Sequence, residues 1–355
     1  MEFWLARPTY NEDVTASQAP DLGAPYLDFP VLPDVSLRYA APLSEYTRFG
    51  IGGPADLLVE TGNPESFAVA IHWLRTRQLP HVVLGGGTNL VVADGGYAGV
   101  VLRFTDRAIR QDGHHIHCGA GAELMDLVQF SVDAGLEGIQ TLMGIPGWVG
   151  AAIYGNAGAY GHSIEEVVER VDFFDGEALR SFTRAECQFR YRESIFKRNK
   201  QWTILRATLQ LKPGDRDALQ KIAADILATR NAKFPPTMRC AGGIFKNQLA
   251  AELLPAILAQ VPTSVIREGK IPSAWFLEQI GAKGRRIGGI QVAEYHANLI
   301  YNDGDATADD LCDMIDQLKA DVFARFGITL EEEVQYFGFE PPRGQRPDAT
   351  NTPVA

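Results

Sequence analysis

The hydrophobic pattern around residue 60 predicts a strand, a helix and a second strand in succession. A short apolar run at 57–60 is typical of a strand, and a second run begins at Val82. Between them, Asn63 suits a helix N-cap and Pro64 the first helical position. The expected helix has one apolar face, with side chains at i, i+4 and i+7: Phe67, Ile71 and Leu74. This order predicts an α/β unit.

Towards the C-terminal end, the pattern changes to one typical of an α+β domain, after a turn at 212–215. Thr307 and Asp310 suit the start of the last helix, and Gly327 suits its end. Before this turn, a short helix is expected at 123–134. After it, helical segments are expected at 219–226 and 308–326, and strands at 287–292, 298–301 and 333–337. The apolar face of the middle helix is formed by Leu219, Ile222 and Ile226.

The segment that follows Val82 is the strongest candidate for a binding site. Two apolar runs flank Gly85, Gly86, Gly87, Thr88 and Asn89. Glycines leave backbone N–H groups bare, so a phosphate can approach closely, and diphosphate is the expected ligand. The segment lacks both common nucleotide-binding signatures. A tight hairpin without a ligand is the alternative.

A second glycine-rich segment, at 144–161, also indicates close packing of the backbone. It carries a proline and many glycines and alanines. Either a flat ligand or a neighbouring strand can account for this composition.

Composition and charge restrict the class of protein. The chain has 355 residues, 46% hydrophobic and 22% charged, and a net charge of −11. These values favour a globular protein of two or three domains and disfavour nucleic acid and anionic membranes as partners. The four cysteines are far apart, which favours free thiols in a reducing compartment. We find no signal peptide and no membrane span, and we expect a cytoplasmic protein.

Four further clusters carry polar groups that could take part in chemistry. The segment 189–197 is read as a charged surface strand, and 239–247 as either a binding turn or a solvated loop. His296 is expected to be structural, and the glutamates at 331–333 to form a solvated turn. No cluster has the spacing of metal ligands, so no metal is expected.

Taken together, these segments resemble the UDP-N-acetylenolpyruvoylglucosamine reductase family, from about Leu43 to Gly338. The resemblance is carried, in order, by 46–53, 85–90, 144–150, 156–161, Tyr191-Arg192-Glu193-Ser194, Phe245-Lys246-Asn247, 296–298 and 330–334. It implies a two-part FAD-binding unit of the vanillyl-alcohol oxidase type and a C-terminal α+β substrate-binding domain. The implied parts are an arm at 1–35, FAD-binding subdomains at 36–105 and 106–213, the substrate domain at 214–338, and a tail at 339–355. The short interval from Arg192 to Gly243 indicates the subtype with a shorter loop.

The resemblance implies a reaction and a set of site residues. NADPH would reduce non-covalently bound FAD, which would then reduce UDP-N-acetylglucosamine enolpyruvate to UDP-N-acetylmuramate for peptidoglycan. Arg192 would stabilise the enolate-like state and Glu333, in its protonated form, would assist. Cofactor contacts would come from Gly85, Gly86, Gly87, Thr88, Asn89, Leu90, Ile145, Gly147, Gly150, Asn156 and Gly158. Substrate contacts would come from Tyr191, Lys246, Asn247 and Lys233. The partners are the UDP-sugar and NADPH, and we expect a monomer.

Gly243 departs from the family pattern, which places a proton-donating serine there. Water or Cys240 could replace that serine, or turnover could be slow. Gln248 is a smaller departure, at a position where proline is common in the family. The alternatives are therefore a catalytically weakened flavin- or UDP-sugar-binding member, and a sugar or alcohol oxidase of the same fold.

Overall fold

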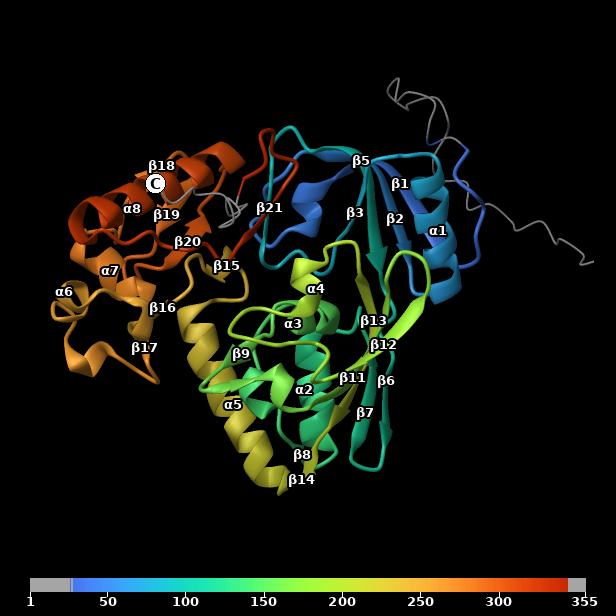
Figure 1. Ribbon diagram of the computed structural model, residues 1–355, viewed down its shortest axis with the longest axis horizontal. Coiled ribbons are helices and arrows are strands. Elements are labelled where there is room, and N and C mark those ends of the chain that lie inside the picture. Colours follow the sequence, from blue (N-terminus) through green and yellow to red (C-terminus); the bar gives the residue numbers. More distant parts are fainter. Residues whose placement is uncertain (1–25, 27, 344–355) are drawn as a thin grey trace, which may run out of the picture.

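A computed structural model of the chain describes Tyr26 and residues 28–343 (Figure 1). Most of the predicted arm and most of the predicted tail lie outside these residues. At the described end of the arm, Tyr26 and Phe29 are buried, and the Phe29 ring lies 5.1 Å from that of Trp73.

The first sheet has the order β1-β2-β5-β3 and contains the predicted α/β unit. Its strands are β1 (Val35–Pro42), β2 (Pro54–Thr61), β3 (His81–Val83) and β5 (Tyr97–Phe104). Helix α1 (Pro64–Thr76) connects β2 to β3, and the Asn63 side chain accepts a hydrogen bond from the Ser66 N–H. Both β2 and β3 run parallel to β5. The predicted strand, N-cap and helix are confirmed.

The second sheet has the order β12-β11-β13-β7-β6 and is antiparallel throughout. Its strands are β6 (Ile109–Asp112), β7 (His115–Gly119), β11 (Val168–Phe174), β12 (Leu179–Thr183) and β13 (Thr203–Gln210). Its helices are α2 (Leu124–Asp133), as predicted, α3 (Val149–Tyr154) and α4 (Ile195–Arg198). Two short strand pairs complete it: β8 (Leu136–Glu137) with β14 (Lys212–Pro213), and β9 (Gly158–Ala159) with β10 (His162–Ser163).

The C-terminal lobe is built on a sheet with the order β15-β20-β19-β18. Its elements are β15 (Arg239–Gly243), β16 (Gln248–Leu249), α6 (Pro255–Leu258), β17 (Lys270–Ile271), α7 (Ser273–Gln279), β18 (Arg286–Ile287), β19 (Ile290–Val292), β20 (Leu299–Asn302) and α8 (Ala308–Phe326). Helix α8 has the predicted Thr307–Asp310 capping box and ends at Gly327 in the left-handed conformation. The single strand predicted at 287–292 is wrong, because Gly288 and Gly289 turn the chain into a β18–β19 hairpin.

Helix α5 (Arg216–Lys233) belongs by its packing to the second sheet rather than to the C-terminal lobe. Its buried residues, Leu219 and Ala223, join the core that also contains α1, α2 and β11. Ile222 was predicted to lie on the apolar face, but its side chain is 41% exposed. Residues of the first sheet, the second sheet and α5 therefore share one continuous core, and a second core is centred on the C-terminal lobe but also takes in Phe49, Ile51 and Val91. The domain limits inferred from the sequence stay predictions.

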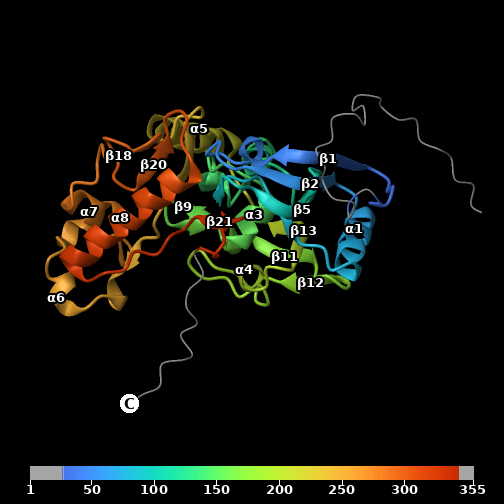
Figure 2. The ribbon, with the colours of Figure 1, turned by 90° about the horizontal axis from the view of Figure 1, so that it is seen from above.

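One strand crosses between the lobes. After α8 the chain returns to the segment that follows the glycines, where β21 (Gln335–Phe337) pairs in parallel with β4 (Leu90–Val92) as a separate two-stranded sheet. Seen from above, β21 and α3 lie between the C-terminal helices α6, α7 and α8 at one end of the molecule and α1 at the other (Figure 2). The glycine segment is therefore not a hairpin, because β3 and β4 pair with different strands.

Candidate functional site

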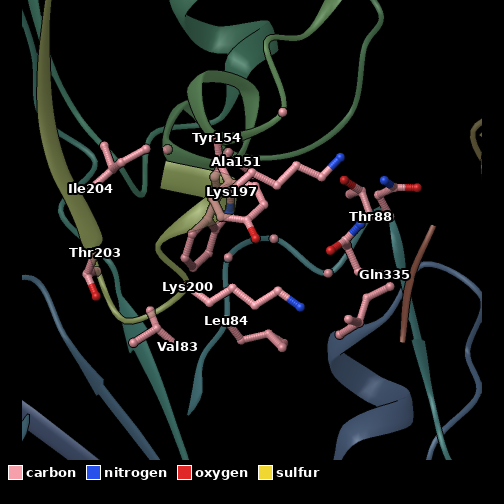
Figure 3. A pocket seen from close by; sticks show the side chains of 18 of the residues that line it. Val83, Leu84, Thr88, Ala151, Tyr154, Lys197, Lys200, Thr203, Ile204 and Gln335 are labelled. Atoms are coloured by element: carbon pink, nitrogen blue, oxygen red, sulfur yellow. The ribbon is translucent and has the colours of Figure 1, made fainter. Parts of the chain in front are cut away.

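A cavity of about 310 Å³ lies where the glycine segment, α3, the 192–204 segment and β21 meet. In Figure 3 the side chains of Lys197 and Lys200 extend toward the side on which Thr88 and Gln335 lie. Of the predicted site residues, those that line it are Gly85, Gly86, Gly87, Thr88, Asn89, Leu90, Gly150, Arg192 and Glu333.

The glycine segment is held between two other stretches of backbone. Gly87 has a φ of +65°, and a Cβ there would overlap the carbonyl oxygen of Tyr46. A Cβ at Gly86 would lie 3.3 Å from the Cα of Gly147, and one at Gly147 would lie 2.6 Å from Thr88 Oγ1. A side chain is thus excluded at Gly87 and crowded at Gly86, so the backbone itself lines the cavity there.

The second glycine-rich segment contains α3, so neither a flat ligand nor a neighbouring strand fully explains its composition. A Cβ at Gly150 would lie 2.9 Å from the Cβ of Ala120, which shows how closely α3 packs on the preceding backbone. Gly150 and Ala151 also line the cavity. Its small residues therefore serve both helix packing and access to the cavity.

Arg192 is held in a fixed position beside the cavity. Its backbone has a φ of +57°, which is uncommon for a residue with a side chain. Its Nη2 donates to the carbonyl of Gly158 at 3.0 Å, and its Nη1 to that of Asn156 at 3.5 Å. Its Nε lies 2.8 Å from Glu333 Oε1 as a charge contact, not aligned for a hydrogen bond. Asn156 and Gly158, predicted to contact cofactor, here orient Arg192.

The backbone of Glu333 is fixed from two sides. Its N–H donates to the carbonyl of Ile244 at 2.7 Å, and its carbonyl accepts from Asn89 Nδ2 at 2.8 Å. Glu333 is therefore hydrogen-bonded both to the C-terminal lobe and to the glycine segment. The side chain of Glu333 lies against Arg192, and the protonated form that the resemblance implies stays a prediction.

Two lysines share one carboxylate at the junction of the lobes. Glu193 Oε1 lies 3.2 Å from both Lys197 Nζ and Lys246 Nζ, and Lys246 also lies 2.6 Å from Glu331. Burial disfavours the Lys246 cation, but its hydrogen bonds to Glu331 and Glu193 outweigh burial and raise its pKa. Burial, together with the charge of Lys246, lowers the pKa of Lys197.

The remaining predicted substrate residues lie outside the residues that line the cavity. Lys270 Nζ lies 4.5 Å from the ring centroid of Tyr191, and burial raises the pKa of the Tyr191 hydroxyl. Asn247 Oδ1 accepts from the Ser273 N–H at 3.4 Å. Lys233 is exposed at the end of α5. Also outside the cavity lining is Ile145, which packs on the large core.

Sequence reasoning missed several residues that line the cavity: Trp148, Tyr154, Lys197, Lys200 and Thr203. Lys197 belongs to a segment that we read as a surface strand, and that reading is wrong. An isolated bridge joins Arg190 and Glu193, and Ser194 then caps α4 by accepting from the Lys197 N–H. Ser194 is a residue type that commonly caps a helix, and this signal could have predicted the short helix that carries Lys197.

The predicted proton-donor position lacks a side chain in the structure as in the sequence. A Cβ at Gly243 would lie 3.0 Å from Asn298 Nδ2, and its other surroundings are open enough for a serine. Cys240 is fully buried in a small cluster with Ala293 and Leu299. It is absent from the cavity lining, so this structure gives it no role as a donor.

These features fit a diphosphate-containing cofactor such as FAD. The glycine segment presents backbone where side chains cannot fit, and the Thr203 hydroxyl is a buried cavity-lining group with no hydrogen-bond partner. Within residues 28–343 and Tyr26, no group of three His, Cys, Asp or Glu side chains could hold a metal ion. The same residues contain no helix long and apolar enough to cross a bilayer.

Known proteins resemble the chain over nearly its whole described length. Residues 55–179 match the model of an FAD binding domain, and residues 234–337 that of the UDP-N-acetylenolpyruvoylglucosamine reductase C-terminal domain. A UDP-N-acetylenolpyruvoylglucosamine reductase of Solibacter usitatus is 56% identical over 307 residues, which covers 86% of this chain and 98% of the relative. One of Heliobacterium modesticaldum is 37% identical, covering 84% and 89%.

A solved structure gives the same result. The crystal structure of UDP-N-acetylenolpyruvylglucosamine reductase from Thermus caldophilus superposes with a TM-score of 0.67 at 28% identity, covering 85% of this chain and 98% of that one. The fold and the cavity thus define an FAD-dependent oxidoreductase. This chain belongs to the UDP-N-acetylenolpyruvoylglucosamine reductase family, and the predicted family and fold class are confirmed.

Proposed function

We propose that the protein reduces UDP-N-acetylglucosamine enolpyruvate to UDP-N-acetylmuramate, using non-covalently bound FAD and NADPH, in the synthesis of peptidoglycan precursors. The observation that carries this proposal is the fixed guanidinium of Arg192, paired with Glu333 at the edge of the glycine-lined cavity. Because Arg192 is already oriented by two carbonyls, it can meet a developing negative charge with little reorganisation.

Each part of the site has a proposed task. The backbone at 85–89, together with Gly150, would hold the cofactor, and bound FAD would supply hydride chemistry. Arg192 would hold the substrate carboxylate through its fork of N–H groups. Lys246, which carries a stabilised positive charge, would attract the anionic substrate. Tyr191, Asn247 and Lys233 stay proposed substrate contacts, and a monomeric cytoplasmic enzyme is proposed.

Gly243 favours a second candidate, a family member that binds flavin and UDP-sugar but turns over slowly. The two are separated by reducing the bound flavin with NADPH without oxygen and then adding UDP-N-acetylglucosamine enolpyruvate. Rapid return of flavin absorbance, with UDP-N-acetylmuramate formed, supports the reductase. Reduction without reoxidation supports the weakened member. Reoxidation by oxygen that accelerates with simple sugars would instead indicate an oxidase.

A further inference from the structure

Hydride addition to the enolpyruvyl double bond leaves an electron pair on the carbon beside the carboxylate, and that carbon must take a proton. Gly243 offers no side chain, and Cys240 is buried away from the cavity. Among the described residues that line the cavity is a lysine whose ammonium is already held by hydrogen bonds to the carbonyl of Arg192 and the carboxylate of Glu193. That residue is Lys197.

We propose that Lys197 is a catalytic residue that donates this proton in place of the missing serine. The inference rests on the proposed reductase function and adds the source of the proton to it. Lys197 lines the cavity together with Arg192 and Glu333.

Lys197 is held against the backbone of Arg192, the residue proposed to stabilise the enolate. Lys197 Nζ donates to the carbonyl of Arg192 at 3.0 Å and to Glu193 Oε1 at 3.2 Å. An ammonium has three N–H groups, so these two bonds leave one N–H for the cavity. The Lys197 side chain is 15% exposed, which keeps bulk water from most of it.

The charges around Lys197 favour release of a proton. Burial and the positive charge of Lys246 lower its pKa, while Glu193 and Glu333 oppose that change. Three charged groups therefore face Lys197. Glu193 belongs to its own segment, Lys246 follows β15, and Glu333 precedes β21. A lysine with a lowered pKa is a stronger acid than a serine hydroxyl, and tuned lysines act as acid–base catalysts elsewhere.

The proposed step balances. The hydride forms the first new C–H bond, and the electron pair left on the neighbouring carbon takes a proton from Lys197. One N–H bond of Lys197 breaks and one C–H bond forms, which leaves a neutral amine. After the product leaves, water returns a proton to that amine, so no further reductant or oxidant is required.

The direct test is Lys197→Arg, measured as anaerobic flavin reoxidation by UDP-N-acetylglucosamine enolpyruvate. Arginine keeps the positive charge beside Glu193 but does not release a proton at working pH. We expect reoxidation to slow by about 10²- to 10⁴-fold, as for loss of a general acid. The rate of flavin reduction by NADPH, flavin content and melting temperature are measured in parallel. Lys197→Gln is the second variant if the arginine does not fit.

Two readouts separate proton donation from a structural role. The double variant Lys197→Arg/Gly243→Ser should regain reoxidation, because the serine hydroxyl supplies the proton, whereas Lys197→Arg/Gly243→Ala should not. In the wild type, reoxidation should fall as pH rises through the lowered pKa of Lys197, because the acid must be protonated. That alkaline decrease should be absent from Lys197→Arg.

Each contrary result has a distinct meaning. If Lys197→Arg reoxidises as fast as the wild type, with the same alkaline decrease, water is the donor and the Lys197 proposal fails while the reductase stands. If Lys197→Arg is slow and Gly243→Ser gives no rescue, Lys197 has a structural role and the proposal also fails. If the substrate never reoxidises the wild-type flavin, the reductase function fails, and the Lys197 proposal fails with it.

Discussion

Glu333 Oε1 lies 2.8 Å from Arg192 Nε, and this contact joins the segment before β21 to the second sheet. The Asn89 side chain donates to the backbone carbonyl of the same Glu333. One residue thus links the glycine segment, the C-terminal lobe and the proposed enolate-stabilising arginine. Loss of either partner should affect chemistry more than folding, because both side chains are partly exposed.

Arg192→Met tests the arginine itself. It removes the contact with Glu333 and the two hydrogen bonds to the carbonyls of Asn156 and Gly158. We expect flavin reoxidation by substrate to slow by about 10²- to 10³-fold, the usual effect of losing one group that stabilises a developing anion. Stopped-flow absorbance measures it. Arg198→Met, an exposed arginine bonded to Gln188 on the same segment, is the control and should reoxidise at the wild-type rate.

Gly243→Ser tests whether the absent hydroxyl limits the rate. A Cβ at this position lies 3.0 Å from Asn298 Nδ2, so the Asn298 amide must give by a few tenths of an ångström. We expect faster flavin reoxidation in the serine variant if proton delivery limits the rate. Gly243→Ala has the same Cβ contact and no hydroxyl, so it separates packing from chemistry. Equal rates in the serine variant and the parent would show that proton delivery does not limit flavin reoxidation in the parent.

Gly147→Ala tests the packing that supports the glycine segment of the cavity, because Gly147 lies against Thr88. Gly147 has a φ of +113°, and its added Cβ would meet Thr88 Oγ1 at 2.6 Å. We expect a loss of about 1–3 kcal/mol in stability from backbone strain and weaker FAD binding, measured by urea unfolding and by flavin titration of the apoprotein. Gly95→Ala, where an added Cβ meets nothing within 4 Å, should change neither. Unchanged FAD affinity in Gly147→Ala would contradict this view of the cavity.

Thr307→Ala tests a cap that is remote from the cavity. The Thr307 hydroxyl accepts from the Asp310 N–H at 3.0 Å, at the start of the long helix α8. We expect the free energy of unfolding to fall by about 1 kcal/mol with the flavin spectrum unchanged. Thr307→Ser keeps the hydroxyl and should retain most of that stability. A flavin spectrum that changes with the alanine variant would show that α8 acts on the site.

The buried ring of His296 should make the free energy of unfolding depend on pH. Burial, with a smaller effect of Lys233, lowers the pKa of His296 to about 4. Between the ordinary histidine pKa near 6.5 and this value, the unfolded chain binds a proton that the folded chain does not. The contribution of His296 is therefore complete above about pH 6.5 and falls as the pH drops, by at most about 3 kcal/mol.

Urea unfolding at pH 7 and pH 5 measures that slope. His296→Gln removes the titrating ring, so its stability should change less between the two pH values than that of the wild type. His114→Gln, at an exposed position in the β6–β7 turn, is the control and should keep the wild-type slope. An unchanged slope in His296→Gln would assign the acid sensitivity to other groups.

Local signals determined many elements correctly. Asn63 and Pro64 begin α1, and Thr307, Asp310 and Gly327 bound α8, because capping depends on hydrogen bonds within one turn of the chain. Where a prediction depended on packing, it was less accurate. Ile222 has helical spacing but faces solvent, because α5 presents Leu219 and Ala223 to the large core.

The sequence by itself determined the family and the glycine segment, because motif order and residue type are properties of the chain. Only the tertiary structure decided how distant segments meet. Strand β21 returns to pair with β4 and brings the C-terminal lobe against the second sheet. This pairing is what gathers the charged residues of the site: Arg192, Glu193, Lys197, Lys246 and Glu333. Such pairing depends on burial and strand register across the whole molecule, which no local pattern records.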